Sequence, residues 1–183
     1  MSRRPPIDRR QSGRRPHRYP AGIVVVPPSP LFAEPWSARA ADLVLVQARA
    51  LQGLARDRQP LLRGKQFGLL CDDAADPSAL LFRRACGALG AHVSLVRPLR
   101  HEADDAGSFD DTARLLGRLY DAIECQGPAT ALVQLLRERV GIPVFAGSAT
   151  PEHPSVRLIE QLDGSPAERR ECVLQALLIV SLS

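Results

Sequence analysis

The chain has 183 residues, enough for one α/β domain with its own hydrophobic core. Apolar residues make up 45% of the chain and charged residues 24%, as in an ordinary soluble globular protein. No stretch reaches the length of a transmembrane helix, and the apolar run at residues 23–26 is too short for the core of a signal peptide. These features argue against a membrane-spanning protein, and we expect a cytoplasmic location and no membrane partner.

The net charge of +4 is concentrated in one segment. Residues 1–20 hold seven arginines and one aspartate, a net charge of +6, which leaves −2 for residues 21–183. The segment is also rich in proline, which supports neither a helix interior nor a central strand, so we expect residues 1–28 to form a disordered tail. Such a tail can bind RNA or DNA through the phosphates. A solvated leader without a specific role is the simpler interpretation.

Helical and strand-like patterns alternate along the rest of the chain. Ser37 is a suitable N-cap for a first helix, with an apolar face at Leu43, Val46, Ala50 and Leu54. Strands are then expected at residues 67–71, 92–96, 122–125 and 142–146, and helices at residues 78–89, from Ser108 in a capping box, and at residues 130–140. The alternation predicts an α/β fold with a mostly parallel sheet flanked by helices on both faces.

Ligand sites in such sheets lie at the carboxyl ends of the strands, here residues 71–78, 96–107, 125–128 and 146–153. A last helix begins after Ser165, with Pro166 at its first position and Glu168 at its third. It is apolar almost all round after Val173, so it must be buried, either on the domain or in a subunit interface.

The four cysteines (Cys71, Cys86, Cys125 and Cys172) lack the spacing of a metal site. We expect buried, reduced thiols, with a disulfide or redox role as the alternative, and we expect neither a metal nor a cofactor. Lys65 is the only lysine, from which we expect a GC-rich, bacterial genome, but this carries no functional information.

Four segments together resemble the ornithine carbamoyltransferases, within the aspartate/ornithine carbamoyltransferase family. Residues 62–65 lead into the first strand as in that family, and residues 111–121 are close to its DTARVLGRMYD segment. Residues 142–147 are similar to its VPVxNG strand, and His153-Pro154 to the start of its HPTQ motif. The resemblance covers roughly residues 35–160 and implies the carbamoyl-phosphate-binding domain of that family.

Family members carry a second, amino-acid-binding domain with HCLP and SMG motifs, and neither motif occurs in this sequence. Residues 169–178 are similar to the final helix of the family, which packs back on the first domain. We therefore expect an internal deletion of the second domain. The expected organisation is a tail at residues 1–28, a carbamoyl-phosphate-binding-like domain at residues 29–162, and a linker with the last helix at residues 163–183.

The family holds the phosphate in a strand-to-helix loop that reads STRTR, where helix N–H groups and two arginines bind the anion. The matching residues in this chain are Ala75, Asp76, Pro77, Ser78 and Ala79. Both arginines are missing, Pro77 lacks an N–H, and the carboxylate of Asp76 would repel a phosphate. At about 1.5–3 kcal/mol for each hydrogen bond to a charged group, the loss weakens binding by about 3–6 kcal/mol. The sequence predicts a degenerate carbamoyl phosphate site.

Other family positions agree with this interpretation. Gln126 stands where the family has the arginine of YRG, Val156 replaces the glutamine of HPTQ, and residues 101–105 are acidic where family members extend a loop into a neighbouring subunit. Ser78, Gln126 and His153 are the remaining candidates for ligand binding, and His153 is the one family-matched catalytic candidate, although a structural role is the more common one for such a histidine.

Three functions stay open at this point. The first is a non-catalytic pseudoenzyme that forms a homo-oligomer, a trimer as in the family, or joins a full-length carbamoyltransferase as a regulatory partner. The second is a ligand-binding or carbamoyltransferase-related activity with a rebuilt anion pocket, in which Ser78, Gln126 and His153 converge. The third is nucleic-acid binding through the tail. If the chain is an enzyme, the family reaction is carbamoyl transfer to an amino acid amine.

Overall fold

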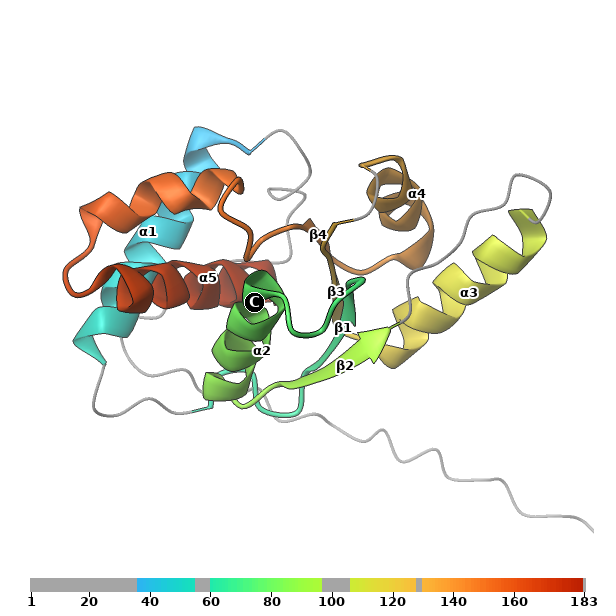
Figure 1. Cartoon of the computed structure of the whole chain (residues 1–183), viewed down its shortest axis with the longest axis horizontal. Helices are drawn as coiled ribbons and strands as arrows, with labels where there is room; N and C mark the ends of the chain where they lie inside the picture. The colour runs from blue at the N-terminus through green and yellow to red at the C-terminus, as the bar shows by residue number, and fades with distance from the viewer. Residues whose placement is uncertain (1–35, 55–59, 97–105, 128–129, 183) are drawn as a thin grey trace, which may run out of the picture.

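The computed structural model describes residues 36–54, 60–96, 106–127 and 130–182 (Figure 1). The predicted tail at residues 1–28 and the acidic residues 101–105 lie outside these ranges. No helix in the described ranges is long and apolar enough to cross a membrane.

Four parallel strands form one sheet in the order β2-β1-β3-β4. They are β1 (Gln66–Leu70), β2 (His92–Val96), β3 (Ala122–Cys125) and β4 (Val144–Ala146). The chain leaves β1 toward one edge of the sheet to make β2, then crosses back over β1 to make β3 and β4. This reversal creates a topological switch point between the carboxyl ends of β1 and β3, where ligands bind in open α/β sheets.

Helices cover both faces of the sheet, and the predicted α/β class is confirmed (Figure 1). One core layer contains α1 (Ala38–Gly53), α2 (Pro77–Ala88), the 3-10 helix η2 (Pro154–Gln161) and α5 (Pro166–Leu182). The other contains α3 (Ala106–Leu119) and α4 (Thr130–Val140), packed on Leu70, Ile123 and Val144.

The start of α1 is confirmed, but its predicted apolar face is wrong. Ser37 is the N-cap and its hydroxyl accepts a hydrogen bond from the Ala40 N–H at 3.1 Å. The buried stripe is Ala40, Val44, Gln47, Ala48 and Leu51, whereas Val46 is exposed. The helix is apolar on more than one side, so spacing alone did not select the face that packs on α5.

Element boundaries differ from the predictions by one or two residues. Helix α3 begins at Ala106, so Ser108 lies inside its first turn instead of capping it. Strand β1 is shifted by one residue and β4 begins at Val144, after Ile142 and Pro143. Boundaries are the least determined part of any element, because end residues contribute few hydrogen bonds.

Helix α5 has the predicted capping box and the predicted burial. The Glu168 N–H donates to Ser165 Oγ at 3.3 Å, and the Ser165 N–H donates to Glu168 Oε2 at 2.9 Å. These bonds lower the pKa of the Glu168 carboxyl, through the side-chain bond first and the backbone bond second. Every residue from 172 to 181 is buried, because α5 lies between α1, α2 and η2.

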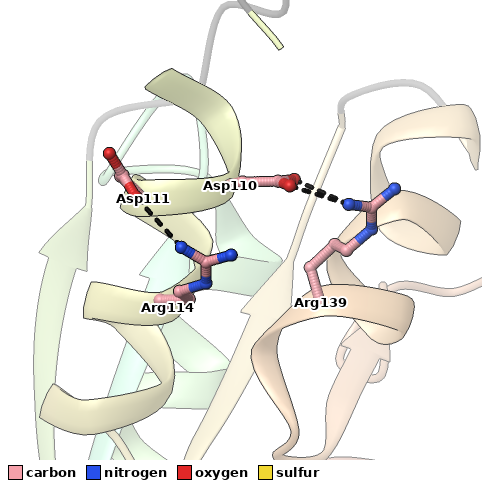
Figure 2. A network of polar contacts seen from close by, with 4 residues as sticks. All are labelled: Asp110, Asp111, Arg114 and Arg139. Carbon is pink, nitrogen blue, oxygen red and sulfur yellow. Dashed lines mark hydrogen bonds and ion pairs between the residues drawn. The ribbon is translucent and has the colours of Figure 1, made fainter. Parts of the chain in front are cut away.

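The segment that carries the strongest family resemblance, residues 111–121, is structural in this chain. Asp111 pairs with Arg114 on the exposed side of α3, and the neighbouring Asp110 receives two hydrogen bonds from Arg139 of α4 (Figure 2). Gly117 lies against the backbone of Val140, where an added Cβ would stand 2.1 Å from the carbonyl oxygen. The segment thus joins α3 to α4.

The end of the same segment holds α3 to the sheet. The Tyr120 ring lies against Gly68 of β1, 3.1 Å from the position that a Cβ there would occupy. Asp121 accepts hydrogen bonds from Lys65 Nζ and from the Gln66 N–H, both at 2.9 Å. None of these residues lines the pocket described below.

Candidate functional site at the switch point of the sheet

A pocket of about 530 Å³ opens at the switch point, between the residues that follow β1 and those that follow β3. A third side comes from residues 150–152, after β4. The described lining residues are Cys71, Asp72, Asp73, Asp76, Pro77, Ser78, Gln126, Gly127, Thr150, Pro151 and Glu152. The pocket has the size and the position of a small-molecule site in this class of fold.

The charge of the pocket wall is negative. Four carboxylates line it, those of Asp72, Asp73, Asp76 and Glu152, and no arginine, lysine or histidine is among the described lining residues. The pKa of the Cys71 thiol is raised, first by partial burial and then by the negative charges of Asp73, Asp72 and Asp76. This arrangement disfavours an anion in the pocket.

The N-terminus of α2, where a phosphate would bind, is capped by the chain itself. Asp76 Oδ1 accepts the Ser78 N–H at 2.7 Å, and Pro77 at the first helical position has no N–H to offer. In the preceding turn, Asp73 Oδ1 accepts the Ala75 N–H at 2.8 Å. Two backbone donors at this end of the helix, those of Ala75 and Ser78, are therefore already bound to carboxylates.

A buried carboxyl group lies beneath the pocket. Glu124 of β3 is fully buried, and burial raises the pKa of its carboxyl from 4.5 to about 7. Hydrogen bonds from the Ser148 hydroxyl (2.8 Å to Oε2), from Gln126 Nε2 (3.3 Å to Oε1) and from the backbone N–H groups of Ser148 and Ala149 lower the pKa and partly offset the burial. The group ties the residues after β3 to the loop after β4, and both segments line the pocket.

Gln126 is the residue that links this network to the pocket. It is only 5% exposed and lines the pocket wall, with its Nε2 committed to Glu124. Its carbonyl oxygen, Oε1, is buried and has no hydrogen-bond partner within the described part of the chain. An unpaired buried acceptor costs free energy, which a bound donor would recover.

His153 does not join Ser78 and Gln126 in the pocket. It is the N-cap of η2, where Nδ1 accepts the Ser155 N–H at 3.2 Å and lies 2.8 Å from the Ser155 hydroxyl. Its ring meets Trp36 edge to face at a centroid distance of 5.4 Å. The structure therefore brings Ser78 and Gln126 together at the pocket and places His153 at the start of η2, beside Trp36.

The described residues offer no metal centre and no disulfide. No group of three or more histidine, cysteine or acidic side chains in the described ranges lies close enough together to hold a metal ion. All four cysteines are free, and Cys86, Cys125 and Cys172 are buried. Burial raises the pKa of the Cys125 thiol to about 12 and raises that of Cys86 as well, so neither is a thiolate near neutral pH.

Three acidic residues of the pocket wall and two residues of the buried network beside it were not singled out from the sequence: Asp72, Asp73 and Glu152, and Glu124 and Ser148. The signal for Glu124 was present, since a single carboxyl interrupts the four-residue apolar strand 122–125, which a parallel sheet buries on both faces. The signal for the others was only that they follow strands.

The pocket thus lies where α/β domains with an open parallel sheet bind small molecules, and known proteins of similar sequence can be compared with the chain. The chain is 36% identical over 125 residues to an ornithine carbamoyltransferase of Cutibacterium acnes, a match that covers 63% of the chain and 37% of that protein. It is 38% identical over 101 residues to a catabolic ornithine carbamoyltransferase of Rhizobium meliloti, covering 55% and 30% respectively. The chain thus spans about a third of the length of these curated relatives.

Solved structures show the same fold. An ornithine carbamoyltransferase of Pyrococcus furiosus matches with a TM-score of 0.57 and 23% identity over 72% of this chain and 42% of that one. The catalytic subunit of the M. jannaschii aspartate transcarbamoylase matches with a TM-score of 0.53 and 23% identity over 68% and 42%. No protein-family model matches the chain. The resemblance to the aspartate/ornithine carbamoyltransferase family is confirmed over about 60% of the chain.

Proposed function

We propose that this chain is a cytoplasmic, non-catalytic relative of the ornithine carbamoyltransferases, whose switch-point pocket no longer binds carbamoyl phosphate. One observation carries the proposal: the N-terminus of α2 is capped by the carboxylate of Asp76 and is surrounded by three further carboxylates. Carbamoyl phosphate is an anion, and a site for it needs donors and positive charge at this position.

Ser78 and Gln126 are the two predicted ligand-binding residues that do line the pocket. They supply a hydroxyl and a carboxamide, and neither brings positive charge. Loop residues Ala75, Pro77 and Ala79 add no charged side chain, and the Ala79 side chain is buried in the core. These features support a pocket kept for a role other than carbamoyl transfer.

Calorimetry with carbamoyl phosphate, and separately with inorganic phosphate, tests the proposal at low salt. We expect no saturable heat and no thermal shift at millimolar ligand, because each lost hydrogen bond to the phosphate removes about 1.5–3 kcal/mol. The Cutibacterium acnes ornithine carbamoyltransferase, titrated in parallel, is the positive control. Saturable binding of carbamoyl phosphate at micromolar concentration would show that other groups have rebuilt an anion pocket.

The exposed outer strand favours a second element of the proposal, self-association as a homo-oligomer, with a trimer as the expected form. Strand β2 is an edge strand, and nothing in the described part of the chain pairs with its outer side. Leu95 on this strand is 52% exposed, although an exposed apolar edge is a liability that proteins normally protect. A partner subunit over β2 would remove this exposure.

We expect light scattering after size exclusion to show an oligomer, and Leu95→Lys to shift it toward the monomer because a charge on the edge opposes pairing. Val46→Lys, at another exposed apolar residue on α1, is the matched control and should leave the assembly unchanged. A monomer at every concentration would contradict self-association. Mixing with a full-length carbamoyltransferase would then test the hetero-oligomer.

A further inference from the structure

We infer that the switch-point pocket binds a small organic cation that carries N–H donors, an ammonium or guanidinium group, through its carboxylates and the carbonyl oxygen of Gln126. This inference goes beyond the proposed function, which concerns only the loss of anion binding. It rests on two independent features, the charge of the wall and an unpaired acceptor at Gln126.

The wall of the pocket accepts hydrogen bonds from several sides. Asp73 and Asp76 each use Oδ1 for a backbone N–H, and in the described part of the chain Oδ2 of each has no hydrogen bond. Asp72 lines the pocket close to Gly127, and Glu152 lines it from the loop after β4. A positive charge between them would gain attraction without displacing a resident cation, because no basic side chain is among the described lining residues.

Gln126 supplies the second, uncharged feature. Side chains alternate across a strand, so Gln126 extends from the end of β3 on the same side as Glu124 and Ala122, the side that α2 covers. Because Nε2 donates to Glu124, the buried carbonyl oxygen of this pocket-lining residue is left without a partner in the described part of the chain. An N–H donor of a ligand would satisfy it.

The chemistry of these groups narrows the ligand class. Carboxylates and a carbonyl oxygen accept hydrogen bonds, and Ser78 adds a hydroxyl that can do the same. The volume of about 530 Å³ suits a small organic molecule. A bare metal ion fits less well, since the described acidic side chains do not gather into a metal site.

Calorimetry at low salt with methylguanidine and ethylamine hydrochlorides tests the inference, with tetramethylammonium chloride as a cation that has no N–H donor. We expect saturable binding of at least one N–H cation with a Kd of about 1 mM or tighter, and at least about tenfold weaker binding of tetramethylammonium. No saturable binding of either N–H cation to the folded protein would overturn the inference. Equal binding of tetramethylammonium would overturn the role of Gln126.

Variants locate the site. The double variant Asp72→Asn, Asp73→Asn should weaken cation binding at least about tenfold, and asparagine at 73 retains an acceptor for the Ala75 N–H. The charge-matched control is Glu138→Gln, Glu160→Gln on exposed positions of α4 and η2, which should bind as the parent does. If both double variants lost cation binding equally, the cation would be attracted by the overall negative charge of the surface, and the proposed site would be contradicted.

The titrations with carbamoyl phosphate and with inorganic phosphate distinguish the inferred cation site from the proposed loss of anion binding. Cation binding without phosphate binding supports both, whereas phosphate binding contradicts the proposed function and leaves the cation inference to its own titration. A protein that binds neither class retains the proposed loss of carbamoyl phosphate binding and loses the cation site.

Discussion

Glu124→Gln should remove a pH dependence of stability worth on the order of 3 kcal/mol. The carboxyl has a pKa of about 7 in the folded protein, raised by burial, against 4.5 as its ordinary value. Each unit of pKa difference corresponds to about 1.4 kcal/mol, so this group contributes about 3 kcal/mol of pH-dependent stability.

The sign follows from which state binds the proton more tightly. Because the folded pKa is the higher one, the folded protein holds the proton between pH 4.5 and about 7 while the unfolded chain releases it. The contribution of Glu124 is fully present below pH 4.5 and is lost as the pH rises to about 7. A glutamine does not titrate, and its amide can still accept the Ser148 hydroxyl bond.

Urea unfolding of both proteins at pH values from about 4.5 to 8 measures the effect. The free energy of unfolding of Glu124→Gln minus that of the parent should rise by about 3 kcal/mol across this range. Glu138→Gln, an exposed carboxyl on α4, is the control and should give a flat difference. A flat difference for Glu124→Gln as well would mean that the buried carboxyl is not protonated in the folded protein.

Gly117→Ala should destabilise the protein by about 2–3 kcal/mol, although alanine is the better helix former. The new Cβ would lie 2.1 Å from the carbonyl oxygen of Val140, a backbone atom that cannot turn aside. Helices α3 and α4 must then separate, and the contact between Arg139 and Asp110 weakens with them (Figure 2). At about 2–4 °C per kcal/mol, the Tm should fall by roughly 4–12 °C.

Gly87→Ala is the matched control within the same chain. Gly87 lies near the end of α2, is exposed, and would place its Cβ with nothing within 4 Å. The higher helix propensity of alanine is then the only effect, and it should raise the free energy of unfolding by up to about 1 kcal/mol. Thermal unfolding should therefore move in opposite directions for the two variants. Two shifts of the same sign would show that the close approach to Val140 does not control packing of α3.

The sequence predicted the elements well where capping and periodicity agreed. The start of α5 was predicted from Ser165, Pro166 and Glu168, and its all-round apolar surface predicted burial. The face of α1 was not readable, because Val46 and Val44 are equally apolar and the packing of α5 decides which one is buried. The spacing of apolar residues within one helix does not show which of its sides a helix distant in sequence will cover.

The candidate site was predictable in position but not in composition. The match of residues 75–79 to a strand-to-helix loop predicted that Asp76 and Pro77 lie at the start of a helix, where the structure has Asp76 as the N-cap of α2. The position of His153 at the N-cap of η2 was not predictable, because the sequence does not distinguish a histidine that faces a ligand from one that caps a helix before a proline. The network of Glu124, Gln126 and Ser148 joins residues 24 positions apart, and only the folded sheet brings them together.

The packing of α1 against α5 has a consequence for the order of folding during synthesis. Residues 38–53 leave the ribosome more than a hundred residues before residues 166–182, yet Val44, Ala48 and Leu51 are buried in the core layer that contains α5. The layer of α3 and α4 can close earlier, since its helices are near neighbours in sequence. Until α5 has been synthesised, the nascent chain therefore exposes the apolar surface of α1 and α2 that α5 later covers, and at this stage it is most open to binding by a chaperone.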